Sequence, residues 1–375
     1  MPKLDSALII IPTVRKPEVI SHYIHNAIKH NVKLDKFHFL ILTEDFADRD
    51  SYRRELKENN VSGEVMDEKS RNRYLKENRL LKYKKLVPRR SHAETSFGLI
   101  YMQVEDSYEF GFMLDDDTRP VDSHNFFGEH LSNLRFTGEI ESVASDKNWV
   151  NVLYQSFRKH GLYPRGFPYS KMGEKTIKNI VVIHNEGDVY LSQGLWTNVP
   201  DLDAIRILMD GDLNGQSKTR LTEKDFEKSF TIAKGNYTTV CSMNIAFREQ
   251  LIPAFYQFPM DDNPYGIGRF DDIWSGIIAK KVMDSIGKFM ISGYPLCEHN
   301  KAQRSTFKDL MSEAPGYESN ENISDTVAGA EATTSDITEL TSNIAVKMQT
   351  YGRTAFVKYC GKFLEQWCEM ISSIG

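Results

Sequence analysis

Unbroken apolar runs alternate with helix-like segments in the N-terminal third of the chain. Residues 7–11 and 37–42 are apolar runs of strand length, and the helix-like segment 17–30 lies between them. Because a strand, a helix and a second strand in that order favour a parallel crossover, we expect the two runs to share one sheet. A predicted helix, 93–102, and a third apolar run, 109–114, follow. The pattern predicts an α/β fold in which helices flank a nucleotide-binding sheet.

The pattern becomes more irregular and more aromatic from about residue 149. Strands are predicted at 180–184 and 240–247, and a helix is predicted over 273–286, which Asp271 or Asp272 could cap.

The C-terminal part changes character twice. Residues 312–335 are rich in Glu, Ser, Thr, Ala and Gly without an apolar period, which predicts a polar linker. From Asp336, with Glu339 three residues later, apolar side chains recur at helical spacing and predict C-terminal helices over 336–375. We expect a catalytic domain over 1–311, the linker, and helices that pack on the core or on another subunit, in a homo- or hetero-oligomer.

Composition narrows the class of protein. The chain has 375 residues, of which 40% are hydrophobic and 26% charged, with a formal net charge of −5. These values are typical of a globular protein and argue against a nucleic-acid binder. No apolar run approaches the ~18–20 residues of a membrane span. The run Ala7–Ile11 is too short for a signal peptide, and the four cysteines follow no disulfide or metal spacing, so we expect a cytoplasmic protein.

Three consecutive carboxylates, Asp115, Asp116 and Asp117, follow the apolar run 109–114. They would lie at the carboxyl end of a strand, where open α/β sheets bind ligands. Side chains two positions apart point the same way from an extended backbone. Asp115 and Asp117 could therefore hold one hard cation, and that cation could hold a diphosphate. An acidic turn without a ligand is the alternative, since Asp is common in turns.

Other segments offer weaker candidates for the same site. Asp271 and Asp272 could orient a hydroxyl or take its proton, although helix capping is the alternative. His299 could be a third ligand to the cation and Lys301 could neutralise a phosphate, although an isolated histidine is more often structural. A second group suits phosphate or sugar contacts, with a solvated helix face or core packing as the alternatives: Arg89, Arg90, Trp196, Asn198, Asp201 and Asp203.

Several motifs, in order along the chain, resemble those of one family. They are Ile10–Arg15, Met113–Asp117, Arg165–Ser170, Gly194–Ala204, Cys241–Phe247, Gly268–Gly276 and His299–Ala302. The family is the reversibly glycosylated polypeptides, which include the UDP-arabinopyranose mutases, and the resemblance covers residues from about 5 to 310. The sequence departs from the family pattern twice: the second arginine that follows in the family's loop is absent, with Lys171 and Met172 nearby instead, and Gln193 replaces the usual histidine.

The resemblance implies a glycosyltransferase-A type fold, a UDP-sugar donor and a divalent cation, Mn²⁺ or Mg²⁺. Arg165 resembles the arginine that becomes reversibly glycosylated, and Asp45 would lie near the uracil. The residues expected to contact the nucleotide-sugar are Thr13, Arg15, Asp45, Arg89, Arg90, Asp116, Trp196 and Lys301. The expected metal ligands are Asp115, Asp117 and His299, and the expected catalytic residues are Arg165, Asp271 and Asp272.

These observations lead to the expectation of an enzyme that interconverts pyranose and furanose forms of a UDP-pentose, with UDP-arabinose as first choice. A guanidinium with a pKa above ~12 is a poor nucleophile. Arg165 would therefore need a carboxylate to take its proton, or would orient the sugar electrostatically. Two other functions remain open. One is a glycosyltransferase that passes the sugar to a separate acceptor, with Asp271 or Asp272 as general base. The other is a catalytically silent subunit that stabilises an active relative.

Overall fold

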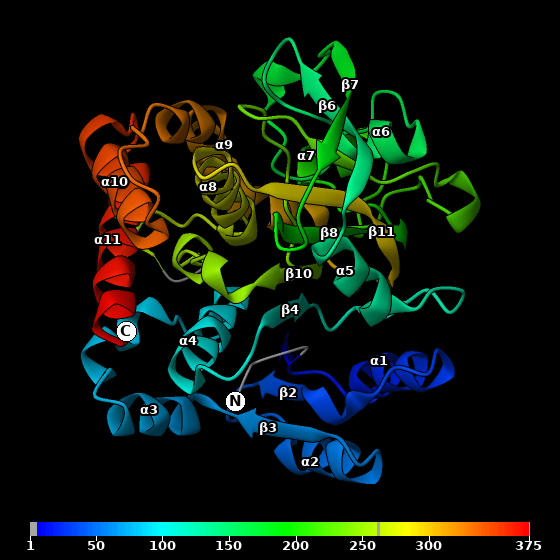
Figure 1. The fold of residues 1–375 in the computed structure, drawn as a ribbon, viewed down its shortest axis with the longest axis vertical. Coiled ribbons are helices and arrows are strands. Elements are labelled where there is room, and N and C mark those ends of the chain that lie inside the picture. The colour runs from blue at the N-terminus through cyan, green and yellow to red at the C-terminus, as the bar shows by residue number, and fades with distance from the viewer. Residues whose placement is uncertain (1–5, 261–262, 375) are drawn as a thin grey trace.

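The computed structural model describes residues 6–260 and 263–374. The strands are β1 (Ala7–Pro12), β2 (Phe37–Leu42), β3 (Ser62–Met66), β4 (Phe110–Leu114), β5 (Thr118–Pro120), β6 (Gly138–Ser145), β7 (Thr176–Ile183), β8 (Val189–Asn198), β9 (Phe230–Ile232), β10 (Asn244–Arg248) and β11 (Phe289–His299). They form one mixed sheet in the order β3-β2-β1-β4-β10-β8-β11-β9-β6-β7, and β5 pairs with β11. Figure 1 shows this sheet running through the molecule with helices on its sides.

Helices cover the sheet and form a C-terminal layer. They are α1 (Glu18–Lys29), α2 (Arg49–Glu58), α3 (Glu68–Glu77), α4 (Ser96–Glu105), α5 (Phe126–Leu134), α6 (Val152–Phe157), α7 (Ala204–Met209), α8 (Asp271–Ser285), α9 (Thr306–Ala328), α10 (Ile337–Tyr351) and α11 (Ala355–Ile374). Short 3₁₀ helices include η2 (Leu81–Leu86), η3 (His92–Thr95) and η6 (Glu249–Ala254). In the part of the chain that the structure describes, no helix has the length and apolar character to cross a membrane.

The N-terminal half is a parallel α/β unit, as the apolar runs predict. All six residues of β1 are buried, and β1 pairs in parallel with β2 and with β4. Strand β10 then runs antiparallel to β4 and to β8, and β11 runs parallel to β8. Strands β1, β4, β8 and β11 therefore point in one direction, and the residues that follow them meet at a single edge of the sheet.

The pairing of β5 with β11 brings the acidic trio to this edge. The turn Asp115–Asp117 connects β4 to β5, and in the β5–β11 ladder Thr118 lies opposite His299. The main chain continues the contact, because the N–H of Asn300 donates to the carbonyl oxygen of Asp117 at 2.7 Å. Two segments that are far apart in sequence are thus fixed beside each other by strand register.

Residues 312–328 form part of α9, which corrects the prediction of a polar linker there. The spacing of apolar residues does not reveal this helix, because its buried face is largely polar and the polar side chains there make hydrogen bonds. Asn320 accepts a hydrogen bond from the Trp274 indole at 3.1 Å, and Ser324 accepts one from the Trp149 indole at 3.2 Å. The predicted C-terminal helices are present as α10 and α11. Asp336 caps α10 by accepting the Glu339 N–H at 2.7 Å.

The start of α8 also differs from the capping interpretation. The N-cap residue is Phe270, and both Asp271 and Asp272 lie inside the first helical turn. Both are buried, with exposed fractions of 5% and 4%. Neither carboxylate is needed as a cap, so each is available for contacts with the interior.

Candidate active site

A cavity of about 200 Å³ lies at the carboxyl edge of the sheet. It collects residues from seven segments of the chain: His92, Asp115, Asp117, Arg165, Asp201, Cys241, Ser242, Met243, Arg269, Asp271, Asp272, His299, Lys301 and Arg304. All the predicted metal ligands and all the predicted catalytic residues are in this set, together with Lys301. We refer to it as the central cavity.

One side of the central cavity offers ligands to a hard cation. Carboxylate oxygens of Asp115, Asp116 and Asp117 lie within 4.8 Å of one another. Among the described residues, Asp117 Oδ1 is buried and has no hydrogen-bond partner, and it lies 3.7 Å from His299 Nε2. His299 Nδ1 lies 2.7 Å from the Val199 carbonyl oxygen, to which a protonated Nδ1 donates. The other ring nitrogen, Nε2, then faces Asp117. This donor set of carboxylates and one imidazole fits Mn²⁺ or Mg²⁺.

Burial and neighbouring charges shift the pKa values of the titratable residues on this side of the cavity. Burial and the neighbouring Asp117 carboxylate raise the pKa of Asp115 to about 7. Burial opposes a charged His299 ring, but the Asp117 carboxylate outweighs it and raises the pKa of His299. Without a bound ion, Asp115 and His299 thus keep their protons to a higher pH than usual, and a cation would displace these protons. Asp116 is oriented differently, since its carboxylate accepts from the Thr13 hydroxyl at 2.9 Å and pairs with Arg15 at 3.1 Å.

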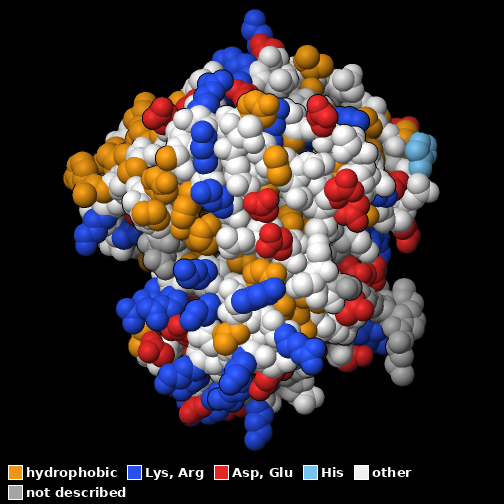
Figure 2. All heavy atoms as spheres, turned by 90° about the vertical axis from the view of Figure 1, so that its left-hand side faces the viewer, with side chains coloured by type: hydrophobic (Ala, Val, Ile, Leu, Met, Phe, Trp, Pro, Cys, Tyr) orange, Lys and Arg blue, Asp and Glu red, His pale blue; other side chains and the backbone are white. Residues whose placement is uncertain are grey.

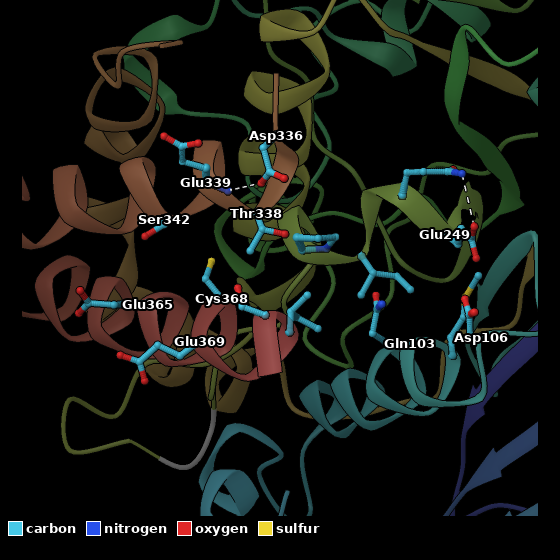
Figure 3. A pocket seen from close by; sticks show the side chains of 16 residues that line it. Gln103, Asp106, Glu249, Asp336, Thr338, Glu339, Ser342, Glu365, Cys368 and Glu369 are labelled. Atoms are coloured by element: carbon cyan, nitrogen blue, oxygen red, sulfur yellow. Dashed lines mark hydrogen bonds between the residues drawn. The ribbon is translucent and has the colours of Figure 1, made fainter. Parts of the chain in front are cut away.

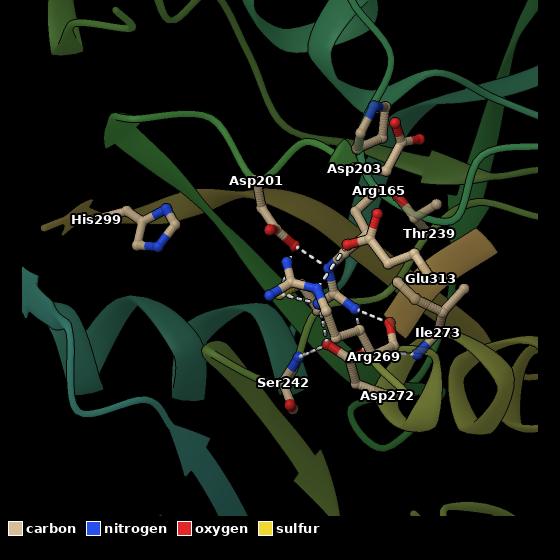
Figure 4. A network of polar contacts seen from close by, with 12 residues as sticks. Arg165, Asp201, Asp203, Thr239, Ser242, Arg269, Asp272, Ile273, His299 and Glu313 are labelled. Atoms are coloured by element: carbon tan, nitrogen blue, oxygen red, sulfur yellow. Dashed lines mark hydrogen bonds and ion pairs between the residues drawn. The ribbon is translucent and has the colours of Figure 1, made fainter. Parts of the chain in front are cut away.

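Arg165, in the wall of the central cavity, is held by Asp201 and Asp272 (Figure 4). Its Nε donates to Asp201 at 2.9 Å, and its two terminal nitrogens donate to the two oxygens of Asp272 at 3.2 and 3.0 Å. Burial opposes the charge, but these carboxylates raise the pKa of Arg165 well above its ordinary value. The next residue, Gly166, has φ of +83°, and a Cβ there would lie 2.5 Å from a side-chain carbon of Ile273. Glycine thus lets the loop pass close to α8.

Asp271 and Asp272 have different partners. Asp272 accepts from Arg165 with both oxygens, and it also accepts the backbone N–H groups of Ser242 and Ile273. Asp271 instead lies 3.1 Å from His92 Nδ1. Burial disfavours the charged ring, but this hydrogen bond outweighs it and raises the pKa of His92 to about 10. No sequence signal singled out His92, which follows two arginines at the start of a predicted helix.

Three further cations, Lys301, Arg269 and Arg304, lie in the wall of the cavity. The Lys301 ammonium is buried and, within the described part of the chain, has no hydrogen-bond partner. Burial lowers the pKa of Lys301, although Asp201 opposes the shift. Arg269 is held by Glu313 of α9 at 2.6 Å, and its carbonyl oxygen accepts from Arg165 (Figure 4). An unsatisfied buried ammonium is expected where an anionic ligand completes the site.

A second hollow of about 300 Å³ adjoins the central cavity and shares His92 and Asp115 with it. We call it the adjoining cavity. Its remaining wall combines apolar and polar side chains: Pro12, Thr13, Val14, Glu44, Phe46, Arg90, Ser91, Glu94 and Asp116. The predicted nucleotide contacts Thr13, Arg90 and Asp116 are therefore here. Asp45 is exposed and lies between two wall residues in sequence without lining the cavity itself.

Several sequence candidates are outside both cavities. Arg89 pairs with Glu68 at 3.3 Å and lines a different hollow. Trp196 is a core residue, 1% exposed. The two departures from the family pattern also lie outside both cavities. Gln193 donates to the Thr239 carbonyl oxygen at 2.9 Å in the core, and Lys171 pairs with Asp325 at 3.7 Å. Neither departure changes the lining of the central cavity.

A larger hollow, about 880 Å³, lies between α4, η6, α10 and α11 (Figure 3). Its charged lining residues are all acidic: Asp106, Glu249, Asp336, Glu339, Glu365 and Glu369. Such a surface repels phosphate groups, so size alone does not identify the site for an anionic ligand.

Comparison with known proteins places these features in a family. A family model described as reversibly glycosylated polypeptide matches residues 78–375. The chain is 32% identical over 201 residues to UDP-arabinopyranose mutase 1 of Arabidopsis thaliana, which covers 53% of this chain and 48% of the relative. It is also 32% identical over 201 residues to the probable UDP-arabinopyranose mutase 2 of Solanum tuberosum, with coverage of 53% and 47%. The chain therefore spans about half the length of the curated relatives it matches.

Solved structures resemble the chain more remotely. Glucosyl-3-phosphoglycerate synthase from Mycobacterium tuberculosis, in complex with phosphoglyceric acid, has a TM-score of 0.40 and 12% identity, covering 84% of this chain and 78% of that one. S. aureus TarS 1–349 has a TM-score of 0.34 and 11% identity, with coverage of 98% and 72%. Similarity at this level does not bear on function.

Proposed function

The chain belongs to the reversibly glycosylated polypeptide family, and we propose that it is an enzyme that interconverts pyranose and furanose forms of a UDP-pentose, UDP-arabinose first. One observation carries the proposal: a single cavity is lined both by carboxylates suited to a divalent cation and by cations suited to a diphosphate. The similarity to proteins named UDP-arabinopyranose mutases supports the choice of reaction and sugar.

The chain's own residues can be assigned to parts of the substrate. Lys301, Arg269 and Arg304 would offset the charge of the diphosphate, and the adjoining cavity would hold the nucleoside. Asp115, Asp117 and His299 would hold Mn²⁺ or Mg²⁺, which when bound supplies Lewis-acid stabilisation of the leaving diphosphate. Thr13 and Arg15 would keep Asp116 oriented toward the same region.

In the interconversion, the bond between the sugar C1 and the β-phosphate oxygen breaks, and its electron pair goes to the diphosphate. The sugar's 4-hydroxyl oxygen then bonds to C1 and gives up its proton, and the C1–O5 bond breaks with its electron pair and a proton going to O5. The diphosphate oxygen bonds to C1 again, so no atom is gained or lost. The Asp271 carboxylate would take the hydroxyl proton and return it, because Asp272 already accepts four hydrogen bonds. His92, whose raised pKa keeps its ring protonated, would donate to Asp271 and orient it. The engaged guanidinium of Arg165 supports an electrostatic, orienting role over covalent attack.

The test is NMR of UDP-arabinopyranose incubated with the protein and Mn²⁺. Furanose signals are expected, and their absence at high enzyme loading would reject the mutase function. Release of labelled sugar only when an acceptor is added would identify a glycosyltransferase instead. If UDP with metal leaves the melting temperature unchanged, the silent-subunit alternative is favoured.

A further inference from the structure

A separate cavity of about 380 Å³ lies between α3, η2 and α11, and it shares no lining residue with the central or adjoining cavities. Its wall has a basic part and an apolar part. Lys84, Lys85 and Arg89 supply the basic part, and Phe363 of α11 with Pro88 contributes to the apolar part. Figure 2 shows that Lys and Arg side chains gather on the lower part of the molecular face to which α3 belongs. We call this hollow the basic cavity.

The cations of the basic cavity are available to a ligand. Across the residues that the structure describes, neither Lys84 nor Lys85 has a hydrogen-bond or ion-pair partner for its ammonium. Arg89 contacts Glu68 at 3.3 Å, with side chains 64% and 33% exposed. An exposed pair of this kind stabilises a protein little, so an incoming anion can replace it at small cost. The volume is within the range of about 300–1,000 Å³ that small-molecule sites occupy.

We propose that the basic cavity is a second nucleotide-binding site. The phosphate would lie on Lys84, Lys85 and Arg89, where ammonium and guanidinium groups make charge-assisted hydrogen bonds. The base would lie against Phe363 and the neighbouring proline surfaces, because aromatic stacking accepts any base. The presence of cations beside an aromatic ring distinguishes the basic cavity from the acidic hollow of Figure 3, which has no cation among its lining residues.

Arg71 connects the basic cavity to the adjoining cavity. It is 3% exposed and lines the basic cavity, and its Nη2 lies 3.0 Å from Glu94 and 3.7 Å from Glu44. Both carboxylates line the adjoining cavity. A phosphate that draws Arg71 toward the basic cavity weakens these pairs, so binding at one site changes the affinity at the other. This coupling, unlike the binding itself, rests on the proposed function.

The experiment titrates AMP and, separately, pyrophosphate into the full chain by isothermal titration calorimetry, in metal-free buffer. AMP is expected to bind, with Kd at least tenfold higher in K84Q/K85Q and within twofold of wild type in K76Q/K82Q. This second pair removes the same charge from the same basic segment, at positions that do not line the cavity. F363L should weaken AMP binding and leave pyrophosphate binding unchanged. Thermal melts establish that each variant is folded.

Each outcome decides the proposal. Absence of AMP binding, or an equal loss in both lysine pairs, would overturn the site, and binding of pyrophosphate without AMP would overturn its assignment to a nucleotide. A threefold or greater change in UDP affinity at saturating AMP supports the coupling, and an unchanged UDP affinity overturns it. If UDP does not bind at all, the proposed function fails, whereas the AMP titration still tests the basic cavity.

Discussion

Glu313, which is fully buried, forms an ion pair with the partly buried Arg269, in which Nε of the arginine lies 2.6 Å from Oε1 of the glutamate. The other carboxylate oxygen of Glu313 accepts the Ala204 N–H at 2.7 Å, near the start of α7. Since the Arg269 carbonyl oxygen accepts from Arg165, the pair connects α9 to the guanidinium in the central cavity. A helix with the composition of a linker thereby positions a predicted catalytic residue.

Glu313→Ala is expected to disturb the site without touching substrate. The variant leaves Arg269 with only the longer 3.8 Å contact to Asp309, and loss of one partner of a buried pair costs about 3–5 kcal/mol. We expect a lower free energy of unfolding by urea denaturation and at least a tenfold lower kcat. The control is Glu318→Ala, an exposed position on the same helix. Unchanged stability and turnover in Glu313→Ala would show that α9 does not position Arg165.

Arg165→Lys tests whether the double hydrogen bond to Asp272 matters beyond charge. Lysine keeps the charge but cannot bond to both oxygens in parallel while also reaching Asp201. Sugar interconversion should therefore fall at least 100-fold while UDP binding, measured by calorimetry, changes less than threefold. Arg248→Lys is the matched control, because this buried arginine pairs with Glu109 outside the central cavity. Full turnover in Arg165→Lys would show that the two parallel hydrogen bonds from Arg165 to Asp272 are not required for the reaction.

Asp117→Asn should weaken Mn²⁺ binding more than Asp116→Asn does. Asp117 has a buried oxygen without a hydrogen-bond partner among the described residues, whereas Asp116 is already engaged by Thr13 and Arg15. Replacing a ligand carboxylate by an amide removes charge from the donor set. Electron paramagnetic resonance of free Mn²⁺ should give at least a tenfold larger rise in Kd for Asp117→Asn. Equal effects of the two substitutions would contradict the assignment of the ligands.

Lys301→Met is expected to stabilise the unliganded protein and weaken its binding of UDP. The wild-type ammonium is buried without a hydrogen-bond partner in the described structure, so replacing it by an apolar chain removes a desolvation cost of roughly 1–3 kcal/mol. Lys280→Met provides the contrast, because the Lys280 ammonium donates to Ala233 and Asp284. That variant should lose stability and retain UDP affinity. A destabilised Lys301→Met with normal UDP affinity would show that the ammonium has a structural role.

Glu94→Gln should remove a pH dependence of stability. Burial raises the pKa of Glu94 to about 7 from an ordinary value of 4.5, although Arg71 opposes the shift. The folded state therefore binds more protons than the unfolded state between these values, and stability falls as pH rises from 4.5 to 7. Above pH 7 the substitution should raise the free energy of unfolding by up to about 3 kcal/mol. Urea denaturation from pH 4.5 to 8 tests this.

The control for the pH series is Glu58→Gln, an exposed change of the same chemistry. It should leave the dependence of stability on pH as in the wild type. The same slope in Glu94→Gln as in the wild type would show that the Glu94 carboxylate does not cause it.

The sequence alone determined the features that depend on local periodicity and motif. Strands β1, β2 and β4 are continuous apolar runs because both faces of a parallel sheet are buried, and such runs are visible without a structure. Asp115, Asp117, Asp271, Asp272 and His299 were predicted as one site, and they line one cavity. Strand β3 was not predicted, because its residues Ser62–Met66 include glycine and glutamate and three of them are incompletely buried.

Only the tertiary structure decided which partner each candidate has. Asp271 and Asp272 are adjacent in sequence and equally acidic, yet one faces His92 and the other is saturated by Arg165. That difference comes from the packing of η3 and of the Arg165 loop against α8, which no local pattern encodes. Likewise Arg89 and Arg90 are neighbours, but the chain turns at Arg90, where φ is +51°, and the two residues line different cavities. Local sequence sets the kind of side chain, whereas long-range contacts set the direction in which it points.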